Sequence, residues 1–234
     1  VGSRLWKATE HFQFVMSGQT LGCIAQTHTN PDQKCIKLVK IPLHQAQREA
    51  IVLFRQREYV QNHAKTGFQF ERLVTGKHAH TPPRHELLKQ LHRVTIAGRF
   101  STLLHGEVDA QTSRGESVEI TTARYYELKV FQMIGAGSSV LCWGRLEPKT
   151  TKLVEVRLMR LSTLLNSPFI QDYMKNIEAT LDSLHRVASE LQCGVVYDID
   201  YPSHIANPHI RPSLDQSALP PWHVIQDLMC QRDD

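Results

Sequence analysis

The sequence predicts a mainly β fold with flanking helices. Alternating or β-branched apolar runs occur near both ends of the chain, and turn-forming residues separate them. One segment, residues 168–191, instead repeats its apolar residues every three to four positions, which is typical of an amphipathic helix. Together these observations indicate strands that close around one core, with a long helix towards the C-terminus.

The N-terminal part of the chain predicts a hairpin followed by an ambiguous apolar run. Thr20–Thr27 alternates, the Thr-Asn-Pro-Asp sequence of Thr29–Asp32 is turn chemistry, and Lys34–Ile41 is a second run with interleaved lysines. We expect these two runs to pair. Glu49–Phe54 fits either a third strand or a helical turn, and its β-branched residues favour a strand.

The middle of the chain predicts a long connection, a short helix and two further strands. Residues 55–81 are mostly polar and basic and indicate the connection. His85–His92 has its leucines on one side, as a short helix would. Val94–Phe100 and Val118–Leu128 are rich in strand-forming residues, and the polar loop Glu107–Glu116 joins them.

A second hairpin is predicted after these strands, and its sequence pattern is similar to theirs. Val140–Leu146 is a short apolar run that ends in Gly-Arg-Leu, and Leu153–Leu161 alternates between apolar and charged residues. The earlier run Val94–Phe100 also ends in Gly-Arg and an apolar residue. This similarity fits either two hairpins of one elaborated barrel or the ends of two small barrels.

The C-terminal region predicts the long helix and then a tail. Ser167 and Pro168 open the helix. Its apolar stripe consists of Phe169, Tyr173, Ile177, Leu181 and Leu184. Residues 192–234 are rich in proline and predict a tail without regular structure that ends in a short helix at Trp222–Cys230.

Composition indicates an ordinary globular protein with a mildly basic surface. The chain has 234 residues, 41% of them hydrophobic, and 27 basic against 23 acidic residues give a net charge of +4. This charge permits a polyanionic partner without requiring one. Five cysteines without a paired spacing are typical of reduced intracellular thiols. No apolar run reaches 18 residues, so we expect a soluble cytosolic or nuclear protein.

Two stretches carry a resemblance to a known family. Gly18–Ile41 resembles the first hairpin, and Leu141–Leu184 the final hairpin and helix, of the middle subunit of replication protein A and its telomere-capping relatives. The resemblance implies an elaborated oligonucleotide/oligosaccharide-binding (OB) fold, a five-stranded Greek-key barrel with a long C-terminal helix. The expected domain spans residues 1–191, with an insertion at about 59–134 and the helix at 168–191.

The resemblance also implies a function. It predicts a non-enzymatic subunit of a nuclear, chromosome-associated complex that protects single-stranded DNA, with other OB-fold subunits as partners and no cofactor or metal. The isolated chain is expected to bind DNA weakly, because only 7% of its residues are aromatic. The alternative is a protein-interaction adaptor that has the same barrel and does not bind DNA.

Candidate binding residues follow from the chemistry of single-strand binding, which needs basic side chains for phosphates and aromatic side chains for bases. They are Lys37, Lys40, Arg99, Phe100, Trp143, Arg145, Lys149, Lys152, Arg157 and Arg160, with Tyr125 as a further stacking candidate. Aromatic residues in strands are usually buried and lysines are usually solvated, so core packing and an ordinary surface are the alternatives. The stripe of the long helix fits either a subunit interface or a lid on the chain's own barrel.

Catalytic and metal-binding interpretations are weaker. The sequence from Ile134 to Val140 is similar to a kinase glycine-rich loop, but Arg157 replaces the required lysine and no metal-binding aspartate motif follows. His78, His80, His85 and His92 cluster in the sequence without cysteine or carboxylate residues at ligand spacing. Asp198 and Asp200 are expected to be solvated turn residues.

Overall fold

The computed structural model describes residues 12–27, 36–43, 48–55, 65–76, 88–147, 152–201 and 208–217. It contains a seven-stranded sheet in the order β11-β10-β2-β3-β1-β5-β4 and a four-stranded sheet in the order β6-β7-β8-β9. The strands are β1 (Phe14–Ser17), β2 (Ile36–Leu43), β3 (Arg48–Arg55), β4 (Leu88–Ile96), β5 (Phe100–Val108), β6 (Ala110–Gln111), β7 (Ser117–Thr121), β8 (Val140–Leu146), β9 (Leu153–Arg160), β10 (Val196–Asp200) and β11 (His209–Pro212). The helices are α1 (Gly18–Ala25), α2 (Lys65–Thr75), the 3-10 helix η1 (Tyr126–Lys129), α3 (Val130–Ala136), α4 (Leu161–Leu165) and α5 (Pro168–Val187).

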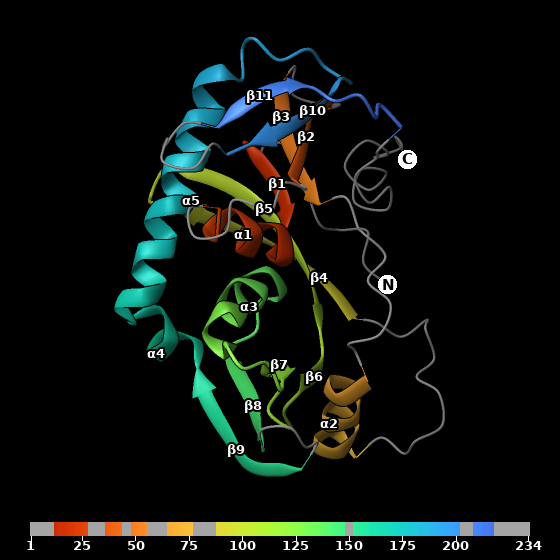
Figure 1. The fold of residues 1–234 in the computed structure, drawn as a ribbon, viewed down its shortest axis with the longest axis vertical. Coiled ribbons are helices and arrows are strands. Elements are labelled where there is room, and N and C mark those ends of the chain that lie inside the picture. Colours follow the sequence, from red (N-terminus) through yellow and green to blue (C-terminus); the bar gives the residue numbers. More distant parts are fainter. Residues whose placement is uncertain are drawn as a thin grey trace.

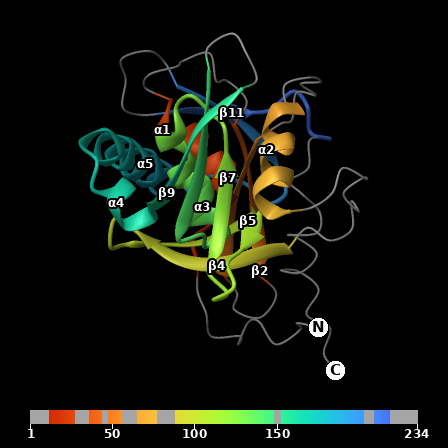
Figure 2. The ribbon, with the colours of Figure 1, turned by 90° about the horizontal axis from the view of Figure 1, so that it is seen from below.

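The fold is mixed α/β, so the prediction of a five-stranded Greek-key barrel is wrong. Strand β1 lies parallel to both β3 and β5, and β7 lies parallel to β8. In Figure 1 the two sheets lie at opposite ends of the molecule, with α1 and α3 between them and α5 along one side. Figure 2 shows α2 and α5 on opposite sides of the strands. The main core is formed by the seven-stranded sheet with α1, α3 and α5.

The predicted strand Thr20–Thr27 is instead helix α1. The Ser17 side chain caps its N-terminus by accepting a hydrogen bond of 3.0 Å from the Thr20 backbone N–H. Seven of its eight residues are buried, so the sequence shows no polar face that would reveal a helical period. The predicted first hairpin is therefore wrong, and β2 pairs antiparallel with β3. Strand β3 confirms the β interpretation of Glu49–Phe54.

The predicted helix His85–His92 and the predicted long connection are also replaced by other elements. Residues 88–96 form β4, which pairs antiparallel with β5 through a tight turn. Ala97 and Gly98 both have positive φ in the three-residue loop 97–99, at 52° and 68°. Residues 65–75, expected within the connection, form α2.

The hairpin of β8 and β9 confirms the second predicted hairpin. Helices η1 and α3 lie between the parallel strands β7 and β8 in the sequence and form their crossover connection. The glycines of the kinase-like segment have a packing role here. A Cβ atom on Gly135 would lie 2.5 Å from Cα of Gly18, so the two glycines allow α1 and α3 to touch.

Helix α5 begins at Pro168, where the sequence predicts it, and packs on the chain's own core. Four residues of its predicted interface stripe are buried: Tyr173, Ile177, Leu181 and Leu184. Phe169 is 46% exposed and packs edge-on against Tyr173. The main contacts of this stripe are therefore internal.

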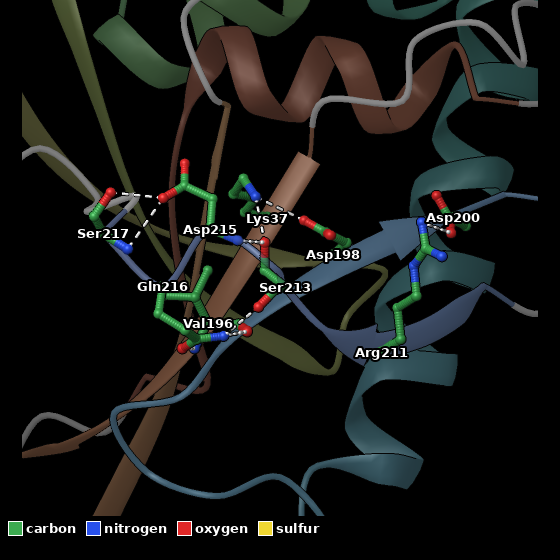
Figure 3. A network of polar contacts seen from close by, with 9 residues as sticks. All are labelled: Lys37, Val196, Asp198, Asp200, Arg211, Ser213, Asp215, Gln216 and Ser217. Atoms are coloured by element: carbon green, nitrogen blue, oxygen red, sulfur yellow. Dashed lines mark hydrogen bonds and ion pairs between the residues drawn. The ribbon is translucent and has the colours of Figure 1, made fainter.

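Strands β10 and β11 extend the seven-stranded sheet, so this part of the predicted tail has regular structure. Lys37 of β2 holds them in place, as Figure 3 shows. Its ammonium lies 2.7 Å from Oδ1 of Asp198 and 2.6 Å from Oγ of Ser213. Burial alone would raise the pKa of Asp198, but the bonds from Lys37 and Ser213 lower it below its usual value. The Gln216 amide donates to the Val196 carbonyl at 2.9 Å and secures the next turn.

Several predictions fall outside the described residues: the terminal helix Trp222–Cys230, the histidines His78, His80 and His85, and Lys149. Among the cysteines that the structure covers, none is in a disulfide; Cys23 and Cys142 are buried and Cys193 is exposed. Within the same parts of the chain, no helix has the length and apolar character needed to cross a membrane.

Candidate active site

The two sheets meet at Asp109, which lies between the last residue of β5 and the first residue of β6. The Ile120 backbone N–H of β7 donates a hydrogen bond of 2.7 Å to Oδ2 of Asp109. Pairing of Ala110 with Val118 places β6 beside β7 and brings this carboxylate to the neighbouring strand. The connection between the sheets thus positions an acidic side chain next to β7.

Glu119 is the second acidic residue of this junction, and it lies in the middle of β7. Its neighbours Val118 and Ile120 pack in a small apolar cluster on one face of the sheet. Since successive side chains of a strand point to opposite faces, Glu119 points to the other face. Its side chain is only 6% exposed.

Lys129, the last residue of η1, supplies a positive charge at this point. Its Nζ lies 3.1 Å from Oε1 of Glu119. It also donates a hydrogen bond to Oε1 of Gln132, one turn further along the chain in α3. The Lys129 side chain is 26% exposed, so it extends from the surface of the protein to the buried carboxylate of Glu119. The junction therefore combines two acidic side chains, one ammonium and one amide.

The electrostatics of the junction raise the pKa of both of its carboxyl groups. Burial raises the pKa of Glu119 to about 7, the charge of Asp109 adds to the rise, and Lys129 opposes it. Burial also raises the pKa of Asp109, against the hydrogen bond from Ile120 and the charge of Lys129. A carboxyl group with a pKa of about 7 exchanges a proton readily at neutral pH, and such groups are common at functional sites.

Helix α2 brings a further acidic residue towards the junction. Its Phe70 is buried in the same apolar cluster as Val118 and lies against the backbone of Gly144, where a Cβ atom would meet the phenyl ring at 2.7 Å. Glu71 follows Phe70 directly, and its charge helps to raise the pKa of Glu119. On the other side, Glu107 of β5 has the same effect on Asp109.

The residues that the sequence predicted for nucleic-acid binding are partly buried and partly exposed. Four of them are buried, namely Lys37, Lys40, Phe100 and Trp143. Four exposed arginines form ion pairs with carboxylates: Arg99, Arg145, Arg157 and Arg160. Lys152 is exposed at the start of β9. Tyr125 is 64% exposed, and it lies close in sequence to Glu119 and Lys129. A contact of the exposed residues with nucleic acid stays a prediction.

No family model matches the sequence, and no curated protein matches it. Solved structures do match the coordinates. S. pombe Rai1 in complex with 3'-FADP superposes with a TM-score of 0.65 at 14% identity, over 88% of this chain and 73% of that chain. K. lactis Dxo1 in complex with manganese gives 0.61 at 14% identity, over 92% and 68%. Candida albicans Rai1 in complex with pU5-Mn2+ gives 0.56 at 13% identity, over 89% and 70%.

The chain has the Rai1/Dxo1 fold. The resemblance to the replication protein A middle subunit and its telomere-capping relatives is therefore wrong. The predictions that depended on it are wrong with it: a non-enzymatic subunit that binds single-stranded DNA, OB-fold partner subunits, and an adaptor built on the same barrel. All of them required a small closed barrel, and the chain forms two sheets instead.

Manganese in two of these complexes raises the question of whether the junction fits a divalent cation. Within the residues that the structure describes, no three Asp, Glu, His or Cys side chains are grouped so that they could hold a metal ion. The ammonium of Lys129 lies beside the most buried carboxylate instead. The donor set as arranged here thus does not fit a metal ion, and the chemistry below is derived from the side chains alone.

Sequence reasoning missed every residue of this site. Glu107 and Asp109 were assigned to a polar loop, and Glu119 lay within a predicted strand without a functional role. A usable signal was present: Glu107-Val108-Asp109 and Val118-Glu119-Ile120 each place carboxylates beside β-branched residues, on strands that are close in the sequence. Acidic residues within apolar strands are unusual and indicate a buried site.

Proposed function

We propose that this chain is an RNA-processing enzyme that hydrolyses a phosphate linkage near the end of an RNA. The observation that supports this most is the junction of the two sheets, where Lys129 faces Glu119 and the carboxyl group of Asp109 lies beside them. The likeness to Rai1 and Dxo1 supports a shared fold, and the chemistry of the junction supports a hydrolytic reaction.

Glu119 is the proposed general base. With a pKa of about 7 it is ionised in a large fraction of molecules at neutral pH, and it is basic enough to take a proton from water. The water oxygen then forms a bond to phosphorus, the bond from phosphorus to the leaving oxygen breaks, and that oxygen takes up a proton. A pKa near the working pH favours both proton transfers.

Lys129 is proposed to stabilise the charge of the reacting phosphate. Its ammonium is partly exposed and fixed by Glu119 and Gln132, so it is oriented before substrate binds. Preorganised positive charge stabilises the transition state of phosphate transfer more strongly in a partly dry site than in water. Asp109 holds the backbone of β7 through Ile120 and so positions Glu119.

The substrate class follows from the ligands of the matched structures. One complex contains pU5 and another contains 3'-FADP. We propose that this chain accepts the same chemistry, an RNA end with one or more phosphate groups. A nuclear location, expected from the sequence, also stays a proposal.

The test is a cleavage assay with short RNAs that differ only at the 5' end. The ends are a monophosphate, a triphosphate, a dinucleotide joined through pyrophosphate, and a hydroxyl group. We expect products from at least one phosphorylated end with the native chain and loss of these products with Glu119→Gln. The matched control is Glu178→Gln, which removes a carboxylate of α5 that pairs with Arg99 away from the junction. Equal products from the native chain and Glu119→Gln, or none from any RNA, would contradict the proposal.

A further inference from the structure

The acidic junction already contains a cation of its own. Lys129 Nζ lies 3.1 Å from Oε1 of Glu119, and its charge also acts on Asp109. Glu107 and Glu71 are the other acidic groups whose charges reach these two carboxyl groups. The ammonium therefore faces Glu119 of β7 and acts on Asp109 of the β5–β6 connection.

The position of the ammonium is fixed by the local helix geometry. Lys129 and Gln132 are three residues apart, across the end of η1 and the start of α3, so their side chains lie on the same side. Gln132 accepts a hydrogen bond from the ammonium and leaves it directed at Glu119. An unpaired lysine would extend into water, since its side chain loses entropy when it is held.

A fixed ammonium and a divalent cation compete for the same carboxylate. A positive charge about 3 Å from a ligand oxygen repels a second cation, and the repulsion is stronger in a buried site than in water. Metal ions of the Mg²⁺ and Mn²⁺ type need several oxygen ligands directed at one point. Among the described residues no such group of three is formed, and Lys129 lies beside the carboxylate that is the most shielded from solvent.

We infer that Lys129 is the resident cation of this site and takes the place of a divalent metal ion there. The native chain then binds Mn²⁺ weakly, in contrast to its structural neighbours that were solved as manganese complexes. Removal of the ammonium leaves Asp109 and Glu119 without their counter-charge, so the junction binds a divalent cation more tightly than in the native chain. The inference concerns the same residues as the proposed function, but it is tested by binding and not by catalysis.

The experiment titrates Mn²⁺ into the full chain at pH 8 and follows the free ion by electron paramagnetic resonance. Lys129→Met removes the charge at nearly constant length, and Lys129→Arg keeps it. The matched control Lys175→Met removes an exposed lysine of α5 that pairs with Asp172. We expect the native chain, Lys129→Arg and Lys175→Met to share one weak affinity, and Lys129→Met to bind at least about tenfold more tightly.

A second variant locates the gained ion. Lys129→Met combined with Glu119→Gln is expected to lose the gain, because the principal ligand has lost its charge. Lys129→Gln, which keeps a donor for Gln132, replaces Lys129→Met if that variant does not fold. A Mn²⁺ dissociation constant in the low micromolar range for the native chain would overturn the inference. An unchanged Mn²⁺ affinity in a folded variant that lacks the ammonium would also overturn it. If no RNA is cleaved but Lys129→Met still binds Mn²⁺ more tightly than the native chain, the proposed function is rejected and the inference about Lys129 stands.

Discussion

The ammonium of Lys129 lies 3.1 Å from Oε1 of Glu119, although the two residues belong to different elements, η1 and β7. The contact joins the crossover helices to the four-stranded sheet at the point where that sheet meets β5. Since the Glu119 side chain is 6% exposed, burial is the main cause of its raised pKa, and the ion pair with Lys129 opposes the rise.

The buried carboxyl group of Glu119 is expected to make stability depend on pH. Its pKa rises from an ordinary value of 4.5 to about 7 on folding, so between these values the folded state binds more protons than the unfolded state. The free energy of unfolding therefore falls as pH rises from about 4.5 to 7. Urea unfolding at pH 5 and pH 8 should show this loss, on the order of 1 kcal/mol or more, in the native chain. The loss should shrink in Glu119→Gln, and an equal loss in both proteins would contradict the assignment.

Phe70→Ala should release α2 from the four-stranded sheet. Phe70 is buried against Gly144 and the cluster of Val118, and removal of a buried phenyl group costs about 3–5 kcal/mol. We expect faster amide hydrogen exchange over residues 65–75, with protection of the seven-stranded sheet unchanged. Leu73→Ala is the control, because Leu73 is an exposed residue of the same helix. Equal exchange in the two variants would show that Phe70 does not anchor α2.

The contact of α1 with α3 can be tested with two helical glycines. A Cβ atom on Gly135 would lie 2.5 Å from Cα and 2.6 Å from N of Gly18, so Gly135→Ala should destabilise the chain by about 1–3 kcal/mol. A Cβ atom on Gly22 would lie 3.5 Å from Cβ of Phe131, which is an ordinary contact. Gly22→Ala should therefore be neutral or stabilising by up to about 1 kcal/mol. Thermal unfolding measures both, and equal effects would contradict the close approach.

Tyr125 is predicted to stack on a base of the RNA. It is 64% exposed on the loop after β7, the Arg124 guanidinium lies 5.6 Å from its ring centre, and Trp143 anchors the loop with a 3.0 Å hydrogen bond to Ala123. Base stacking on an aromatic side chain contributes about 1–3 kcal/mol, so Tyr125→Ala should raise KM by about 5- to 150-fold with little change in kcat.

Two controls accompany the Tyr125 measurement. Tyr125→Phe keeps the ring and should behave as the native chain. Leu214→Ala removes an exposed apolar side chain from another surface and should leave KM unchanged. If Tyr125→Ala matches the native KM, the ring does not contact RNA.

Local patterns in the sequence predicted part of this fold. The hairpin β8–β9 and the start of α5 were predicted correctly because each has one solvent-exposed and one buried face. This arrangement produces a regular spacing of apolar residues in the sequence. Helix α1 was missed because it is buried nearly all round. Strand β4 was read as a helix because three leucines among residues 85–92 fit a helical face, and its pairing with β5 overrides that local preference.

The candidate site was not predictable in the same way. Asp109, Glu119 and Lys129 lie on three different elements, and only the passage from one sheet to the other and the crossover helices bring them together. Their sequence spacing of ten residues on each side indicates no known motif. Most of the exposed arginines among the predicted nucleic-acid contacts are paired with acidic side chains in the fold, which the sequence alone did not indicate.

The pH dependence of RNA cleavage by the native chain and by Glu119→Gln tests the central claim most directly. If Glu119 is the general base, kcat of the native chain rises with pH to a plateau with a midpoint of about 7, because the carboxylate form is the active one. Glu119→Gln should lose about 10²- to 10⁴-fold in kcat and the midpoint with it. A native rate without a midpoint in this range, or a variant that keeps the native rate and profile, would contradict the account.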